Sequence, residues 1–269
     1  MNDSFAPLLA SLKAHAPLIH AITNPISIHQ CANAILAVGA RPIMAEHPRE
    51  VAEITETAGA LLLNLGNITD VRMESMEISA QTACRCGIPF VLDAVGVGCS
   101  SLRREYAHGL LQRFSPGILK GNYGEIHALA HPDYTASGVD GDQALSVDAA
   151  ANSAAALARR YGCTVLASGK TDLVTDGVQA ILIGNGTPQL SRVTGTGCML
   201  GALCSCFLTT CPPLQAGAAA CVALGVAGQL AETPQGSGTF MQQLMDRLSC
   251  LDGETMQTYQ IMEEYHLAS

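Results

Sequence analysis

Short apolar runs alternate with longer segments of helical character along the first two thirds of this chain. An apolar run of about 4–8 residues predicts a buried strand, and a longer periodic segment predicts a helix. The predicted strands cover residues 18–22, 41–44, 60–65, 88–92, 117–120 and 163–167. The predicted helices cover residues 5–15, 27–38, 48–58, 72–86, 101–113, 123–130 and 147–161. This alternation is typical of a mostly parallel sheet with helices on both faces.

The pattern changes after residue 167. Three strand-like runs cover residues 173–175, 178–183 and 189–193, separated by Asp176-Gly177 and Gly184-Asn-Gly186. Such turn sequences between strand-like runs are hairpin signals, so we expect a few antiparallel strands here. Helices are predicted at about 199–209, 214–232 and 238–250. We therefore expect a single α/β domain over residues 1–269, in which residues 131–146 form a mobile or variable loop.

Composition limits the partners of this fold. Hydrophobic residues make up 48% and charged residues 14%, a balance that favours a large core and buried subunit contacts over a monomer. A net charge of −9 gives no basis for general attraction to nucleic acid. The 11 cysteines and a start without an export signal predict reduced thiols in the cytoplasm. The apolar runs at 199–208 and 216–231 are shorter than the ~20 residues that span a bilayer.

Polar or small residues follow nearly every predicted strand. They are Asn24, Met44, Asn64 with Gly66, Asp93, Lys120 with Asn122, Ser168 with Lys170, and Thr194 with Cys198. The carboxyl ends of parallel strands meet at one edge of a sheet, where ligands of such folds bind. We therefore expect a ligand site at this edge.

Three charged residues at this edge suggest phosphate chemistry. Asp93 is placed to hold Mg²⁺ through water, Lys120 to meet a phosphate, and Glu125 to reach the metal or its water shell. Taken singly, an aspartate here is equally typical of a helix cap, and a lysine or glutamate of a solvated surface. The histidines show no metal-ligand spacing, and His20, inside an apolar run, is more typical of a core histidine than of a base.

The stretch Val193-Thr-Gly-Thr-Gly-Cys198 leads into a predicted helix. Gly195 and Gly197 let backbone N–H groups approach a ligand closely, and a helix start favours an anion such as phosphate. The field of the helix favours a thiolate at Cys198, whereas a nearby phosphate opposes it, so the protonation state of this thiol stays open. A plain glycine turn between two elements is the alternative interpretation.

Several segments together resemble the hydroxyethylthiazole kinase family of the ribokinase-like superfamily, in the family's order from about residue 15 to 250. The matching segments are His20-Ala-Ile-Thr-Asn24, Arg41-Pro-Ile-Met44, Leu61-Leu-Leu-Asn-Leu-Gly66, Leu92-Asp-Ala-Val-Gly-Val-Gly98, Lys120-Gly-Asn-Tyr-Gly-Glu-Ile126, Gly138-Val-Asp140, Ser168-Gly-Lys-Thr-Asp-Leu-Val-Thr-Asp-Gly177, Val193-Thr-Gly-Thr-Gly-Cys198 and Gly236-Ser-Gly-Thr-Phe240. Ribokinases at large carry aspartate at the position of Cys198, whereas the thiazole kinases carry cysteine. At this position the chain therefore resembles the thiazole kinases.

The resemblance implies a three-layer α/β/α fold and transfer of the ATP γ-phosphate to the hydroxyl of 4-methyl-5-(2-hydroxyethyl)thiazole in thiamine biosynthesis. It also implies Mg²⁺ and a homotrimer with sites shared between subunits. The implied residues are Cys198 for catalysis; Met44, Gly195 and Asn24 for the thiazole; Lys120, Ser168, Thr194 and Gly197 for ATP; and Asp93 and Glu125 for the metal.

Two positions depart from the family pattern, and three other functions stay open. Ala94 stands where the family usually has proline, and Tyr123 stands where it has a small residue. The alternatives are a kinase for another vitamin precursor such as a hydroxymethylpyrimidine, a thiol hydrolase with Cys198 as nucleophile, and a non-catalytic binding protein. A hydrolase would need a histidine partner for the thiol, and local spacing supplies none.

Overall fold

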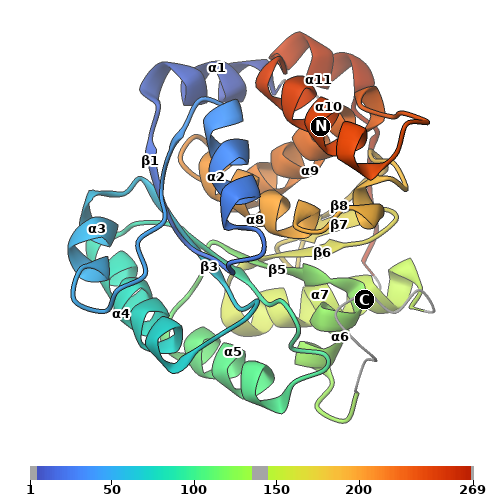
Figure 1. Ribbon diagram of the computed structural model, residues 1–269. Helices are drawn as coiled ribbons and strands as arrows, with labels where there is room; N and C mark the ends of the chain where they lie inside the picture. The colour runs from blue at the N-terminus through green and yellow to red at the C-terminus, as the bar shows by residue number, and fades with distance from the viewer. Residues whose placement is uncertain (1–4, 135–144, 268–269) are drawn as a thin grey trace.

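A single nine-stranded sheet runs through the computed structural model, which describes residues 5–134 and 145–267 (Figure 1). The spatial order is β2-β1-β3-β4-β5-β6-β7-β8-β9. The strands are β1 (Leu18–Ile22), β2 (Arg41–Ile43), β3 (Ala60–Asn64), β4 (Phe90–Asp93), β5 (Ile118–Asn122), β6 (Thr164–Ser168), β7 (Asp172–Thr175), β8 (Ala180–Ile183) and β9 (Met262–Glu264). Strands β1 to β6 are parallel and β7 to β9 are antiparallel, so the predicted mixed sheet is confirmed.

Helices cover both faces of the sheet, as predicted (Figure 1). One layer holds α1 (Ala6–His15), α2 (Ile28–Ala37), α8 (Thr196–Phe207), α9 (Pro213–Leu230), α10 (Ser237–Ser249) and α11 (Gly253–Tyr259). The other holds α3 (Val51–Thr57), α4 (Asp70–Cys86), α5 (Ser101–Arg113), α6 (Tyr123–Ala130) and α7 (Val147–Tyr161). Successive strand residues point to opposite faces, so Leu62 packs into the first core and its neighbours Leu61 and Leu63 into the second.

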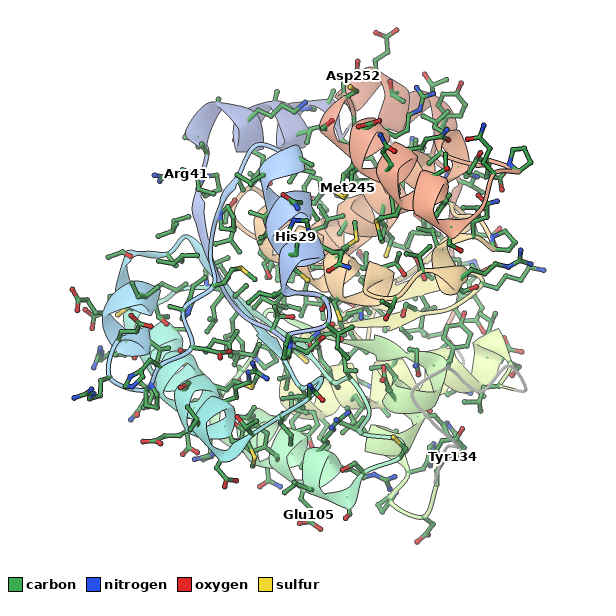
Figure 2. All side chains as sticks on the ribbon, in the orientation of Figure 1. His29, Arg41, Glu105, Tyr134, Met245 and Asp252 are labelled. Atoms are coloured by element: carbon green, nitrogen blue, oxygen red, sulfur yellow. The ribbon has the colours of Figure 1, made fainter. Side chains whose placement is uncertain are left out.

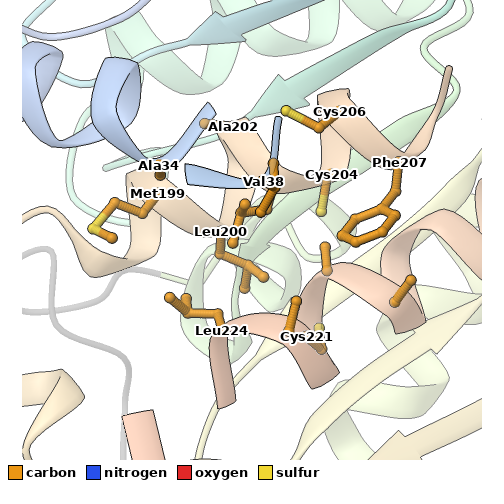
Figure 3. Close-up of a cluster of buried hydrophobic side chains, with 14 of the residues drawn as sticks. Ala34, Val38, Met199, Leu200, Ala202, Cys204, Cys206, Phe207, Cys221 and Leu224 are labelled. Carbon is orange, nitrogen blue, oxygen red and sulfur yellow. The ribbon is translucent and has the colours of Figure 1, made fainter. Parts of the chain in front are cut away.

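The first core is built around α8, which lies between α2, α9 and the sheet. Met199, Leu200 and Phe207 of α8 pack beside Val38 and residues of α9, as Figure 3 shows. Side chains fill the space between the sheet and both helix layers (Figure 2). This packing fixes the start of α8 over the carboxyl ends of the central strands.

Helix α9 is the one described helix long and apolar enough to cross a membrane by length and composition. Its residues 216–228 are all buried, and it packs against α8, α10 and strands β5 to β8. The core helix of a folded domain passes the same test, and α9 has the contacts of such a helix.

The predicted strand at 189–193 is wrong. Leu190–Arg192 forms a short 3-10 helix, η1. Gln189 Nε2 donates to Thr233 O at 2.6 Å, and Gln189 Oε1 accepts the Thr233 N–H at 3.1 Å. These two bonds hold the segment against the start of the loop before α10. The edge of the sheet beside β8 is occupied instead by β9, which the sequence pattern did not predict.

Other boundaries differ by smaller amounts. Helix α8 begins at Thr196, three residues before the predicted start, and α3 begins at Val51 because residues 48–50 form a turn. Helix α11 was not predicted. The predicted loop at 131–146 and the segment Gly138-Val-Asp140 lie largely or wholly outside the described residues.

Candidate active site

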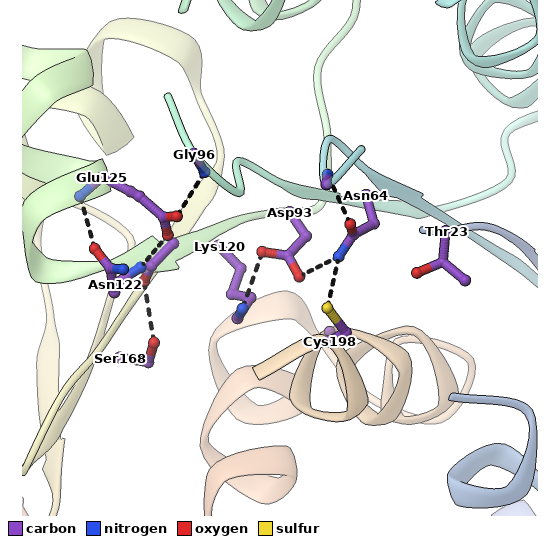
Figure 4. A network of polar contacts seen from close by, with 12 residues as sticks. Thr23, Asn64, Asp93, Gly96, Lys120, Asn122, Glu125, Ser168 and Cys198 are labelled. Carbon is purple, nitrogen blue, oxygen red and sulfur yellow. Dashed lines mark hydrogen bonds and ion pairs between the residues drawn. The ribbon is translucent and has the colours of Figure 1, made fainter. Parts of the chain in front are cut away.

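Polar side chains from three neighbouring strands meet at the carboxyl edge of the sheet (Figure 4). The register of β3, β4 and β5 pairs Asn64 with Asp93 and Asp93 with Lys120. Asn64 Nδ2 donates to Asp93 Oδ2 at 2.8 Å, and Lys120 Nζ donates to Asp93 Oδ1 at 2.9 Å. Asn24, which follows β1, donates from Nδ2 to Cys198 Sγ and to Asn64 Oδ1, both at 3.2 Å. We call Asn24, Asn64, Asp93, Lys120 and Cys198 the polar network.

The centre of this network is a buried ion pair. The side chain of Asp93 is fully buried, and that of Lys120 is 4% exposed. Burial by itself lowers the pKa of Lys120, but the negative charge of Asp93 and its neighbours raises it above its usual value. Burial raises the pKa of Asp93, while the Lys120 ammonium and the Asn64 amide oppose that rise. Burial and pairing thus act in opposite directions on Asp93, and the 2.9 Å contact favours the ionised pair.

The start of α8 presents free backbone donors beside this pair. Gly195 is the N-cap in the left-handed conformation, with φ +91°, and Thr196 Oγ1 fastens the turn by donating to Leu190 O at 2.9 Å. Among residues 5–134 and 145–267, no group accepts a hydrogen bond from the N–H of Thr196, Gly197 or Cys198. A Cβ added at Gly197 would lie 3.7 Å from Lys120 Nζ. The donors and the ammonium therefore converge, as an anion site requires.

Glu125 lies in the first turn of α6, which directly follows β5, the strand of Lys120. Its Oε1 accepts the Gly96 N–H and its Oε2 accepts the Asn122 N–H, both at 2.7 Å, as part of a capping box. Burial raises the pKa of Glu125 to about 7, although Lys120 and the two N–H donors oppose the rise. Ser168, the register partner of Asn122, donates from Oγ to Gly121 O at 3.3 Å.

The two departures from the family pattern have local explanations. Ala94 donates its N–H to Lys120 O at 2.8 Å, a bond that proline cannot make. The ring of Tyr123 is buried against Gly169, and its hydroxyl donates to Thr171 O at 2.6 Å. Tyr123 therefore supports the turn after β6 through its ring and its hydroxyl.

Six of the predicted site residues lie outside the polar network: Met44, Glu125, Ser168, Thr194, Gly195 and Gly197. Met44 follows β2 and is half-buried against the core on the α2 side of the sheet. Thr194 precedes the N-cap of α8. Gly195 does lie beside the α2 start, since a Cβ added to it would be 3.2 Å from Ser27 Cβ.

Sequence reasoning missed the residues that hold the segment after Met44. His20 is fully buried, as expected of a core histidine, and its Nε2 lies 2.9 Å from Ala45 O. Burial lowers the pKa of His20. Because a carbonyl oxygen can only accept, Nε2 is the donor in the bond to Ala45 O. Arg72 binds both carboxylate oxygens of Glu46, at 2.8 and 3.3 Å, and Ser75 Oγ donates to Glu46 O at 2.8 Å. The sequence pattern places Asn64 at a strand end but does not indicate its contacts with Asp93 and Cys198.

The carboxylates at this edge suit a metal that a substrate helps to hold. The described residues contain no group of three or more His, Cys, Asp and Glu side chains able to hold a metal. Mg²⁺ in kinases is commonly bound through one or two carboxylates, with phosphates and waters completing its shell. Asp93 and Glu125 are hard oxygen donors of this kind, and each oxygen that accepts one hydrogen bond retains another lone pair.

The arrangement of sheet, helices and edge site defines a class. A ribokinase-like superfamily protein from Enterococcus faecalis V583 superimposes with a TM-score of 0.63 at 14% identity, covering 88% of each chain. At this identity the likeness shows the fold alone, which is ribokinase-like.

The particular family follows from closer matches. The model of the hydroxyethylthiazole kinase family matches residues 9–254, and the chain belongs to this family. "Hydroxyethylthiazole kinase 2" of Clostridium botulinum (strain 657 / Type Ba4) is 43% identical over 243 residues, which cover 88% of this chain and 92% of the relative. The structure of a hydroxyethylthiazole kinase protein from Pyrococcus horikoshii OT3 has a TM-score of 0.88 at 32% identity, covering 97% of this chain and 99% of that one.

Proposed function

We propose that this protein transfers the γ-phosphoryl group of ATP to the hydroxyl of 4-methyl-5-(2-hydroxyethyl)thiazole. The observation that carries the proposal is the convergence of three free N–H groups of α8, the Lys120 ammonium and the Cys198 thiol at one edge of the sheet. A phosphoryl group needs such donors, and membership of the hydroxyethylthiazole kinase family supports the acceptor.

The proposed residues divide by partner. We assign Asn24, Met44 and Gly195 to the thiazole; Lys120, Ser168, Thr194 and Gly197 to ATP; Asp93 and Glu125 to Mg²⁺; and Cys198 to the reacting hydroxyl. Bound Mg²⁺ would neutralise charge on the ATP phosphates. The first turn of α8 carries both the Cys198 sulfur and the free N–H groups. We therefore propose that the thiazole hydroxyl and the transferred phosphate meet there.

In the proposed reaction, the bond from the γ-phosphorus to the bridging oxygen of ADP breaks while the hydroxyl oxygen of the thiazole bonds to that phosphorus. The N–H groups of residues 196–198 and the Lys120 ammonium stabilise the negative charge of the transferred group. We propose that Cys198 Sγ lies beside this hydroxyl and, as a thiolate, accepts its proton, which the resulting thiol later returns to solvent. Phosphoryl transfer has a loose transition state, so positioning and charge stabilisation contribute more than this base.

A coupled assay of ADP release tests the proposal. With ATP, Mg²⁺ and the thiazole alcohol, we expect turnover that depends on all three. Turnover with a hydroxymethylpyrimidine alcohol instead would favour the other vitamin-precursor kinase. Ligand-dependent thermal stabilisation without ADP release would show a binding protein. Ester or amide hydrolysis that is independent of ATP and blocked by iodoacetamide would show a thiol hydrolase.

We also propose that the protein is a homotrimer with active sites between subunits. Ile26, in the turn before α2, and Leu36, in its last turn, are 61% and 55% exposed, and the chain has few charged residues to cover its surface. Ile26 lies close to the polar network, because Asn24 and Ser27 join the same turn. Light scattering after size-exclusion chromatography measures the mass, which for a trimer is three times 28.0 kDa.

We place the protein in the cytoplasm and treat residues 1–269 as a single domain. All eleven cysteines are free thiols, a state that a reducing compartment maintains. Cell fractionation tests the location, and a single unfolding transition in denaturant tests the domain organisation.

A further inference from the structure

Asn64 is the most highly connected side chain of the polar network. It ends β3 and is fully buried. Its Nδ2 donates to Asp93 Oδ2 at 2.8 Å and to Cys198 Sγ at 3.4 Å. Its Oδ1 accepts the Gly66 N–H at 2.9 Å and Asn24 Nδ2 at 3.2 Å. Each polar atom of the amide therefore has two partners.

The chemistry of these partners fixes the orientation of the amide. Gly66 N–H is a donor and Asp93 Oδ2 is an acceptor, so a flipped amide would oppose donor to donor and acceptor to acceptor. Asn64 consequently faces Asp93 and Cys198 with hydrogens. The carboxylate is held between this amide and the Lys120 ammonium, one on each oxygen.

The sulfur of Cys198 is held by two amides. Asn24 Nδ2 lies 3.2 Å and Asn64 Nδ2 lies 3.4 Å from Sγ. These two N–H groups restrict the Cys198 side chain to one direction in the first turn of α8. Asn64 is the side chain that contacts both this sulfur and the carboxylate of Asp93.

We infer that Asn64 is a positioning residue that sets the Cys198 thiol and the Asp93–Lys120 pair in their mutual arrangement through its two N–H bonds. It acts through Asp93 and Cys198. The inference rests on the proposed kinase function for its effect on turnover. Its contact with the sulfur is independent of that function.

Two substitutions separate the donors of Asn64 from its structural contacts. Asn64→Asp keeps an oxygen that accepts from Gly66 and Asn24 but places a second oxygen against Asp93 and Cys198. Asn64→Ala removes all four contacts. If Asn64 only supported the turn at Gly66, Asn64→Asp would behave like wild type. We expect kcat to fall about 10- to 100-fold in both variants at pH 8, with the KM values for ATP and thiazole within about threefold of wild type.

Thr175→Val is the matched control. Thr175 is also fully buried and has two hydrogen bonds, to Gln179 O at 2.6 Å and from Gly177 N–H at 3.0 Å. It ends β7 and pairs with Val165 near the start of β6, at the opposite edge of the sheet. We expect a lower melting temperature with unchanged kcat. A kcat of Asn64→Asp within twofold of wild type, or a loss confined to KM, would overturn the inference.

Alkylation of Cys198 by iodoacetamide provides a readout that needs no turnover. The rate is followed by mass spectrometry on the peptide that contains Cys198, and the exposed Cys84 serves as an internal standard. A carboxylate beside the sulfur disfavours the reactive thiolate, so we expect Asn64→Asp to slow the reaction of Cys198 at least fivefold and to leave Cys84 unchanged. An equal rate would overturn the inference.

The two readouts also separate this inference from the proposed function. Wild-type protein that releases no ADP refutes the kinase function, and the alkylation rates then decide the contact between Asn64 and Cys198. Active wild-type protein with an unaffected Asn64→Asp variant refutes the inference alone.

Discussion

The substitution Gly66→Ala adds one methyl group to the place where two buried amides touch the backbone. The new Cβ would lie 2.8 Å from Asn24 Nδ2 and 2.9 Å from Asn64 Oδ1, and ordinary contact begins at 3.4 Å. Both amides must therefore retreat by about 0.5 Å, against their mutual hydrogen bond and the bond from Gly66 N–H. The φ of Gly66 is not positive, so the backbone itself accepts alanine.

The size of the effect follows from these contacts. A buried polar group that loses its partner costs about 1–3 kcal/mol. Alanine also reduces the conformational entropy of the unfolded chain relative to glycine, and this stabilises the protein by about 0.4–1 kcal/mol. We expect Gly66→Ala to lower the free energy of unfolding by about 1–2 kcal/mol. Because Asn24 and Asn64 both hold Cys198, we expect kcat to fall about tenfold as well, since sub-ångström displacement of reacting groups is costly.

Gly109→Ala is the control for this experiment. Gly109 lies in α5, and a Cβ added there meets no atom within 4 Å. Like Gly66→Ala, this variant lowers the conformational entropy of the unfolded chain, and alanine has a higher helix propensity than glycine. We therefore expect stabilisation by up to about 1 kcal/mol with unchanged kcat. Urea unfolding and steady-state kinetics measure both variants. Equal stabilities of the two variants, together with wild-type kcat in Gly66→Ala, would refute the reasoning.

Three further predictions concern the same edge of the sheet. Cys198→Ala removes the sulfur but keeps the N–H groups of α8, so we expect kcat to fall about 10- to 100-fold without complete loss of activity, and a near-wild-type kcat in steady-state assays would exclude the thiol from the reaction. Gly195→Ala places a side chain at φ +91° and 3.2 Å from Ser27 Cβ, so we expect a loss of at least about 1–2 kcal/mol in urea unfolding and a higher KM for ATP. In metal-free protein, the raised pKa of Glu125, about 7 against 4.5, means that folding takes up a proton between these pH values. The contribution of Glu125 to stability is therefore complete below about pH 4.5 and is lost as the pH rises through about 7. We expect Glu125→Gln to change the difference in unfolding free energy between pH 5 and pH 8 by up to about 3 kcal/mol. An unchanged difference would contradict the raised pKa.

The layers and the edge of the sheet could be predicted because they depend on local pattern. Apolar runs of strand length separated by helical segments define the parallel sheet, and its topology brings Asp93 and Lys120 to the same edge. Hydrogen bonds depend on register and helix placement, which one sequence does not contain. The four contacts of Asn64 require β3, β4 and α8 together, and the pair of Arg72 with Glu46 joins residues 26 positions apart.

Errors occurred where tertiary contacts outweighed local preference. Residues 189–193 are predicted as a strand, but the amide of Gln189 binds Thr233, and β9 rather than this segment pairs with β8. Strand β9 has the sequence Met-Glu-Glu, whose polarity is untypical of a strand, and its pairing with β8 alone makes it one.

Strand β9 has a consequence for work with shortened or tagged forms of this protein. It lies beyond residue 254, where the match to the family ends, yet its backbone pairs with Ile181, Leu182 and Ile183 of β8. A chain cut at residue 260 would leave the N–H and C=O groups of β8 facing water along an apolar strand, a template on which other chains assemble into aggregates. The two glutamates of β9 oppose such stacking in the intact protein, so shortened forms should keep residues 262–264, and fused tags are better placed at the other end.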